Sequence, residues 1–203
     1  MGQEQEQLAL DKARGGDREA FGDLVKLHRK RVWKVALHLL GSQAEADDVT
    51  QETFLRAFRG IDRFDGRSEL GTWLYRIVVN LSLNVLRKRK RTASVDPSDP
   101  RLGPPQGGSD PSADVEARKL YARLVEALDQ LSLSLRTTVV LVAIEGLAHK
   151  DVAEILGCSE GTIAWRIHQA RRLLKDRLGD APGTAAPEGE AGPSTPTQKG
   201  EQP

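Results

Sequence analysis

Arginine and asparagine side chains recur at regular spacing in the segment 71–91. Arg76, Asn80, Asn84 and Arg87 stand at i, i+4, i+8 and i+11, which places them on one face of a helix. An asparagine amide both donates and accepts hydrogen bonds, so it can read the edge of a nucleobase, and an arginine binds phosphate. This face therefore has the chemistry expected for nucleic-acid binding.

Aromatic side chains accompany this face. Phe64, Trp73 and Tyr75 lie in the loop before it and at its start, and Arg63 precedes the first ring. Stacking on aromatic rings is worth roughly 1–3 kcal/mol per unstacked base, so rings beside cations predict binding to melted or distorted DNA. The alternative is that the rings are core residues and that the basic run 87–91 ends a helix, where cations interact favourably with the helix dipole.

Carboxylates gather earlier in the chain. Glu45, Asp48 and Glu52 share a helical face with Gln51, and DNA would repel such a face. It is either a solvated side of a helix or a docking face for a basic protein surface.

The stretch 151–174 has the layout of a helix-turn-helix. Gly157 allows a sharp turn after a helix that ends at Leu156, and Ser159 can cap the next helix. With the apolar side chains of the second helix packed inward, Trp165 and its polar neighbours point outward, as in a helix that enters a major groove. The alternative is an ordinary helical hairpin with a solvated basic face.

Composition excludes several classes of protein. The chain has 203 residues, 38% of them hydrophobic, and a formal net charge of +1. Cys158 is its single cysteine, so it cannot form an internal disulfide, and the four histidines are scattered without metal-ligand spacing. We therefore expect no catalytic residue, no metal and no cofactor. The longest apolar stretch is too short to span a bilayer, so we expect no membrane insertion and a cytoplasmic location.

Helical periodicity without strand-like alternation predicts an all-α protein. The first helix is expected to run from residue 18 to 40, between an Asp17 cap and a Gly41 stop, and the second from 44 to 58 with Phe54 and Phe58 inward. Breaker-rich segments divide the chain into two small helical domains joined by a flexible linker, the second containing the helix-turn-helix. The expected limits are 1–91 for the first domain, 92–113 for the linker, 114–178 for the second domain and 179–203 for a disordered tail.

Several motifs occur together in a fixed order. They are "DREAF", "DDVTQETFLRAF", "TWLYRIVVNLSLNVLRKRKR", "LSLSLRTTVVLVAIEGL" and "DVAEILGCSEGTIAWRIHQARRLL". In this order the chain closely resembles the extracytoplasmic function (ECF) class of bacterial RNA polymerase sigma factors. The resemblance runs from about residue 17 to 178, and it is the set of motifs that makes it specific.

The resemblance implies a role for each surface. Asp48, Gln51 and Glu52 match the helix that docks on the clamp helices of the largest polymerase subunit. A second set matches the part that melts and reads the minus-10 element: Arg63, Phe64 (in the loop that captures a flipped base), Trp73, Arg76, Asn80, Asn84 and Arg87. A third set matches the reader of the minus-35 element: Thr162, Ala164, Trp165, Arg166, His168, Gln169, Arg171 and Arg172. The chain departs from the family pattern at four base-facing positions, Ala164, Trp165, His168 and Gln169.

The partners implied by the resemblance are core RNA polymerase, promoter DNA as duplex and as melted non-template strand, and an anti-sigma factor that can hold the chain at the membrane. A free-standing helix-turn-helix repressor or activator is the main alternative. Such a protein needs neither an acidic docking helix nor an aromatic strand-capturing loop, so the first half of the chain favours a sigma factor. An enzyme is the third possibility, and the scattered histidines and the absence of a glycine-rich phosphate loop disfavour it.

Overall fold

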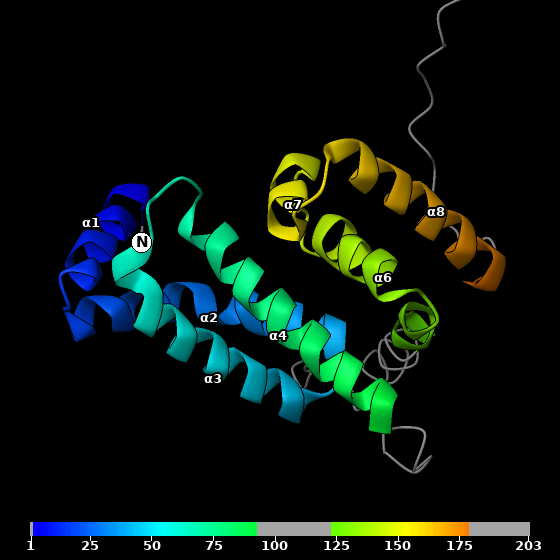
Figure 1. Cartoon of the computed structure of the whole chain (residues 1–203), viewed down its shortest axis with the longest axis horizontal. Helices are drawn as coiled ribbons and strands as arrows, with labels where there is room; N and C mark the ends of the chain where they lie inside the picture. The colour runs from blue at the N-terminus through cyan, green and yellow to red at the C-terminus, as the bar shows by residue number, and fades with distance from the viewer. Residues whose placement is uncertain (1, 93–122, 179–203) are drawn as a thin grey trace, which may run out of the picture.

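The computed structural model describes residues 2–92 and 123–178, which fold into two helical units (Figure 1). None of the residues in these two ranges forms a strand, and the predicted all-α fold is confirmed. The segment predicted as a linker lies outside the described residues except for Thr92, and the predicted tail lies wholly outside them. The domain limits 1–91 and 114–178 stay predictions.

The first unit is a bundle in which α2 packs against three other helices. Its elements are α1 (Gln3–Arg14), α2 (Arg18–Leu40), α3 (Gln43–Gly60), the 3₁₀ turn η1 (Ile61–Arg63) and α4 (Leu70–Thr92). The sequence pattern predicts no helix before residue 18. Among the α1 side chains whose burial is described, Ala9, Leu10 and Ala13 alone are buried, and so narrow an apolar stripe is hard to recognise in a segment rich in Gln and Glu.

The ends of α2 follow the predicted chemistry. The Asp17 carboxylate accepts hydrogen bonds from the backbone N–H groups of Glu19 and Ala20, at 2.9 and 3.1 Å. Gly41 has a left-handed backbone with φ of 67° and donates its N–H to the carbonyl oxygen of Leu37. Both caps satisfy backbone groups that a helix end leaves unpaired, so the predicted helix 18–40 is confirmed.

One prediction for α3 is wrong. Phe54 is buried as expected, but Phe58 is 40% exposed. The end of α3 lies beside the beginning of α2, where the ring of Phe58 meets Phe21 edge-on with centroids 5.1 Å apart. At this corner of the bundle the contact with Phe21 leaves one side of the Phe58 ring open to solvent.

The second unit contains a helical stretch at 123–129 and four further elements. These are α6 (Leu133–Val139), the π-helical turn η2 (Val140–Ile144), α7 (His149–Leu156) and α8 (Glu160–Leu178). α8 packs against both α6 and α7. Its Ile163, Ile167 and Ala170 are buried, which fixes the rotation of α8 about its own axis.

The two units touch each other. α4 contacts α7, and α2 contacts η2. The His38 ring nitrogen Nδ1 is 3.3 Å from a carboxylate oxygen of Glu145. Arg136, only 3% exposed, binds the Asp129 carboxylate and donates to the carbonyl oxygen of His38 at 3.4 Å. Polar contacts therefore join the units at their boundary.

Candidate protein and nucleic-acid surfaces

The predicted docking residues share one side of α3. Asp48 and Gln51 are exposed, and Glu52 is half-buried. The Glu52 carboxylate accepts a hydrogen bond from Arg56 Nε at 2.7 Å, a pair with large solvent exposure on both sides. We call Asp48, Gln51 and Glu52 the acidic face.

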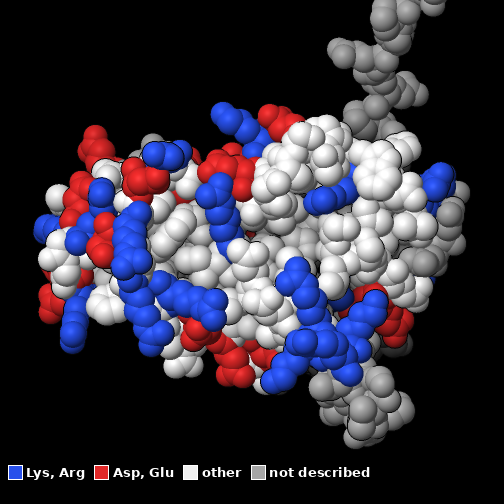
Figure 2. Space-filling view, viewed as in Figure 1, with Lys and Arg blue, Asp and Glu red and all other residues white. Residues whose placement is uncertain are grey.

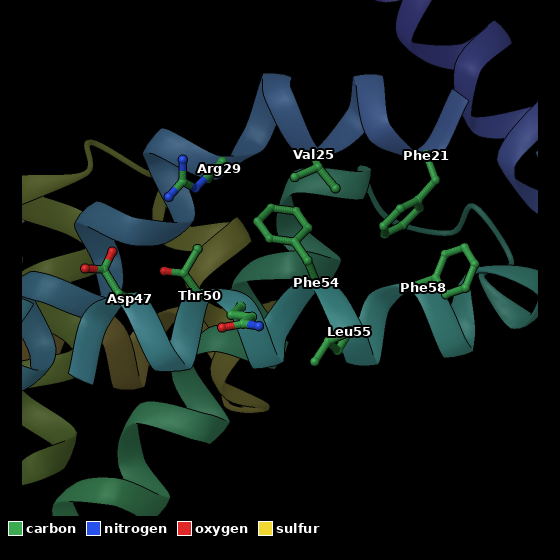
Figure 3. A pocket seen from close by; sticks show the side chains of 9 residues that line it. Phe21, Val25, Arg29, Asp47, Thr50, Phe54, Leu55 and Phe58 are labelled. Atoms are coloured by element: carbon green, nitrogen blue, oxygen red, sulfur yellow. The ribbon is translucent and has the colours of Figure 1, made fainter. Parts of the chain in front are cut away.

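An apolar groove runs next to the acidic face, between α2 and α3. It has a volume of about 540 Å³. Phe21 and Val25 of α2 face Phe54 and Phe58 of α3 across it, and Leu55 lies at its edge (Figure 3). We call this hollow the α2–α3 groove.

The groove and the acidic face form one surface, because Gln51 belongs to both. Leu55 and Phe58 are 44% and 40% exposed, and they stand three residues apart on α3. Among the described residues only Leu8 and Trp165 are other large hydrophobic side chains with comparable exposure. Sequence reasoning missed this apolar part. The sequence contained a sign of it: Leu55 is apolar but lies outside the buried stripe of α3, which is formed by Ala46, Val49, Thr53 and Ala57.

The predicted face of α4 is present as a row. Asn80, Asn84 and Arg87 are exposed, and the Arg87 guanidinium donates to the Asn84 side-chain oxygen at 3.0 Å. Burial, and to a lesser degree the nearby Glu145 carboxylate, raises the pKa of the Tyr75 hydroxyl above its ordinary value. Tyr75 is therefore neutral at physiological pH and adds no charge to this helix.

Lys and Arg side chains gather over the C-terminal end of α4 (Figure 2). Arg89 differs from the rest of the basic run. It is partly buried, binds the Glu45 carboxylate and donates to the carbonyl oxygen of Leu40 at 3.0 Å. Arg89 thus fastens the end of α4 to the junction of α2 and α3, while Arg87 and Arg91 are exposed.

The predicted aromatic loop is packed inward. Phe64 is 4% exposed, and its ring centroid lies 5.2 Å from that of the partly buried Trp73. Arg63, just before it, is exposed and lies within 4.0 Å of Asp62. In this conformation the Phe64 ring is not available for stacking with a base from solvent.

A polar hollow of about 500 Å³ lies over this loop, and Phe64 forms part of its wall. Arg14 of α1, Arg31 of α2 and Ser68 of the loop line it as well. The α1 side chain Glu6 holds the buried His28 ring at 2.9 Å. The hollow therefore depends on α1, which sequence reasoning did not anticipate.

Within the described residues, Arg76 is the member of the α4 row for which hydrogen bonds to the second unit are seen. Its Nε and Nη2 donate to the backbone oxygen of Glu154 on α7, at 3.1 and 3.0 Å, and Nη2 also reaches the Glu154 carboxylate at 3.0 Å. The predicted nucleic-acid face of α4 is thus partly covered by α7.

The helix-turn-helix has the predicted local geometry. α7 ends at Leu156, and Gly157 takes a left-handed backbone with φ of 64°. The Ser159 hydroxyl accepts from the backbone N–H of Thr162 at 3.2 Å and caps the start of α8. Gly157 and Ser159 therefore set the direction in which α8 leaves the turn.

The predicted residues of α8 fall into two groups. The exposed ones are Ala164, Trp165, His168, Arg171 and Arg172, and the half-buried ones are Thr162, Arg166 and Gln169. Arg166 turns back toward the turn, where its guanidinium lies 3.8 Å from the Cys158 sulfur. The outward surface is therefore apolar at Ala164 and Trp165, and polar or basic beyond them.

The described residues contain neither a candidate metal site nor a candidate membrane span. No cluster of His, Cys, Asp or Glu in the described ranges could hold a metal ion. No helix within the same ranges is long and apolar enough to cross a membrane.

Comparison with protein families gives two matches in order along the chain. Residues 24–92 match the model of sigma-70 region 2, and residues 121–174 match that of sigma-70 region 4. The first match contains α3, α4 and most of α2, and the second contains α6, α7 and most of α8.

Individual relatives agree with these matches. The ECF RNA polymerase sigma factor SigW of Bacillus subtilis is 31% identical over 181 residues, covering 84% of this chain and 95% of the relative. SigE of Mycolicibacterium smegmatis, also an ECF RNA polymerase sigma factor, is 37% identical over 166 residues. That alignment covers 80% of this chain but 64% of SigE, so the chain spans slightly less than two thirds of SigE.

A solved structure shares the arrangement of helices. The sigma factor RpoE of Bartonella quintana, in complex with the anti-sigma factor NepR, superposes with a TM-score of 0.62 and 28% identity. The superposition covers 78% of this chain and 96% of the solved one.

Proposed function

We propose that this chain, which belongs to the ECF group of the RNA polymerase sigma factors, uses separate surfaces for the polymerase and for the two promoter elements. It directs core RNA polymerase to promoters and catalyses no reaction itself. The observation that carries this function is the presence of region 2 and region 4 in order on one chain. A free-standing helix-turn-helix regulator has no use for region 2.

The acidic face and the α2–α3 groove together bind the polymerase. The carboxylates of Asp48 and Glu52 form ion pairs with basic side chains of the polymerase. The exposed side chains of Leu55 and Phe58 become buried against it. Burial of apolar surface contributes roughly 25 cal/mol per Å², while the charges add specificity and speed of association. The groove explains why α3 keeps large apolar side chains at its surface.

The row on α4 and the loop before it bind the minus-10 element. Asn80, Asn84 and Arg87 are accessible as they stand, whereas Phe64 must leave its contact with Trp73 before a base can stack on it. Arg76 cannot serve Glu154 and DNA at the same time. Binding along the whole row therefore requires α7 to move away from α4.

Replacing Glu154 with Ala tests that competition. We expect the affinity of the whole chain for a single-stranded minus-10 oligonucleotide to rise about two- to fivefold, the worth of a partly exposed ion pair. Fluorescence anisotropy at fixed salt measures it. Glu126→Ala, which removes an exposed carboxylate from the 123–129 helix, controls for net charge. Equal gains in the two variants would reject competition by the Glu154 carboxylate, since the backbone oxygen of residue 154 remains in both.

The outward surface of α8 binds the minus-35 element. His168 and Gln169 present hydrogen-bonding groups next to the exposed Arg171 and Arg172. Replacing His168 and Gln169 with Ala should change the base preference at one or two positions of a randomised promoter library. Arg172→Ala should instead weaken binding to all sequences alike, as loss of a phosphate contact does. An unchanged motif in the first variant would show that these two side chains do not read bases.

An anti-sigma factor controls the chain, as the complex of RpoE with NepR illustrates for a relative. We place the chain in the cytoplasm. An anti-sigma factor anchored in the membrane would hold the chain at the membrane surface until the signal releases the chain. The signal would then reach the promoter by freeing this chain.

Run-off transcription tests the function as a whole. Purified chain is added to core polymerase of its host with a pool of genomic fragments, and the transcripts are sequenced. We expect discrete start sites that core polymerase alone does not use. Transcripts identical with and without the chain would overturn the proposed function.

A further inference from the structure

Trp165 is the most exposed large hydrophobic side chain of the described residues, at 62%. Its direction is fixed, because Ile163 and Ile167 of the same helix are 0% and 6% exposed against α6 and α7. Residue 165 must therefore point away from the helix-turn-helix core. Ala164, beside it, is exposed as well.

The other two tryptophans of the chain have partners. The Trp33 indole donates to the Asp47 carboxylate at 2.9 Å, and Trp73 packs on Phe64. Within the part of the chain that the structure describes, no hydrogen bond or ring contact engages Trp165. A single exposed apolar residue is ordinary. This one, however, lies on the outward side of the second helix of a helix-turn-helix, the element that enters the major groove.

The chemistry of the indole restricts what it can recognise. It offers a large apolar surface and one N–H donor, and it has no acceptor. It therefore cannot accept from the amino groups of adenine or cytosine. The apolar feature of the major groove is the 5-methyl group of thymine. The methyl group of Ala164 extends the apolar surface, and Arg166 is turned away toward Cys158.

We propose that Trp165 is a specificity-determining residue that packs on the 5-methyl group of a thymine in the minus-35 element. This inference rests on the proposed role of α8, and it adds the chemical group that is read. His168 and Gln169 read by hydrogen bonds further along the helix, so the element combines one apolar contact with polar ones.

Substitution of thymine by deoxyuridine tests the proposal, because it removes the methyl group and leaves the hydrogen-bonding groups of the base in place. Holoenzyme is assembled from the full chain and host core polymerase on a promoter found by run-off transcription. Each minus-35 thymine, on either strand, is replaced in turn. We expect one replacement to weaken binding by the wild-type holoenzyme about fourfold, the effect of one buried methyl group.

The Trp165→Ala chain should bind the unmodified promoter less tightly and should not respond to the sensitive replacement. Arg172→Ala is the matched control, because it should weaken binding to every template and keep the response to deoxyuridine. Trp165 is exposed, so both variants should fold, which circular dichroism verifies.

Two results would overturn the proposal: no deoxyuridine position that matters, or the same response in wild type and Trp165→Ala. Either result leaves initiation by the wild-type holoenzyme intact, so it is distinguishable from failure of the proposed function. If the proposed function itself failed, the wild-type chain would start no transcription on any template.

Discussion

Replacing Asp48 and Glu52 with Lys should weaken binding to core polymerase at least about a hundredfold. Like charges brought together at an interface cost several kcal/mol, and each 1.4 kcal/mol is a factor of ten in affinity. Asp48 is exposed, and the half-buried Glu52 pairs with Arg56 at the surface of α3, where their side chains are 39% and 53% exposed. The fold should therefore survive, since surface changes of this kind alter stability by about 0.5 kcal/mol.

The measurement is a titration of labelled chain with core polymerase at fixed salt, together with thermal unfolding of each chain. Glu4→Lys with Asp11→Lys makes the same change of net charge on exposed positions of α1, and this control should bind normally. If the α3 variant bound core polymerase as tightly as the control, α3 would not be the docking element.

The apolar part of the same surface adds a distinction. A purely electrostatic contact would weaken steeply with salt, whereas burial of Leu55 and Phe58 in the partner would not. Because the α2–α3 groove contributes apolar burial, we expect the wild-type chain to keep binding core polymerase at moderate salt. The acidic face should affect mainly the rate of association.

Phe64→Ala should lower the free energy of unfolding of the first unit by about 3–5 kcal/mol, the usual cost of removing a buried phenylalanine ring. The ring is 4% exposed and packs on Trp73. Urea unfolding followed by circular dichroism measures the change. A loss below about 1 kcal/mol would show that the loop does not hold the ring in the core in solution.

This structural role complicates any promoter assay with Phe64→Ala, because part of the chain would be unfolded. Phe64→Leu separates the two roles. Leucine is apolar and of comparable size, so it should cost less than about 1.5 kcal/mol, but it has no aromatic face for a base. We expect Phe64→Leu holoenzyme to form closed complexes normally and to open promoters more slowly. If Phe64→Leu holoenzyme opened promoters at the wild-type rate, Phe64 would have a structural role in the core and no role in base capture.

Much of the helical framework could be predicted from the sequence because the signals are local. Asp17 and Gly41 bound α2, and Gly157 and Ser159 shape the turn before α8. Each acts on backbone groups within four residues of itself, so no tertiary partner is needed. The rows on α3, α4 and α8 follow equally from the period of a helix.

The accessibility of individual side chains could not be predicted in the same way. Phe58 follows the inward spacing of α3 yet is exposed, because the neighbouring helix covers only one side of it. Phe64 lies in a segment whose composition is typical of a surface loop, yet its side chain is buried. Whether a ring is covered depends on which other element passes over it, and helical spacing does not contain that information.

The sequence by itself determined the family, the all-α fold, the turn geometry and which residue types share each helical face, since these follow from motif order and from contacts a few residues apart. Only the tertiary structure decided that α1 completes a polar hollow over Phe64 and that α2 and α3 enclose an apolar groove. It also decided that the Arg76 guanidinium forms an ion pair with Glu154. Arg76 and Glu154 are 78 residues apart in the chain. Contacts at such separation arise from the packing of whole helices, and no local pattern encodes them.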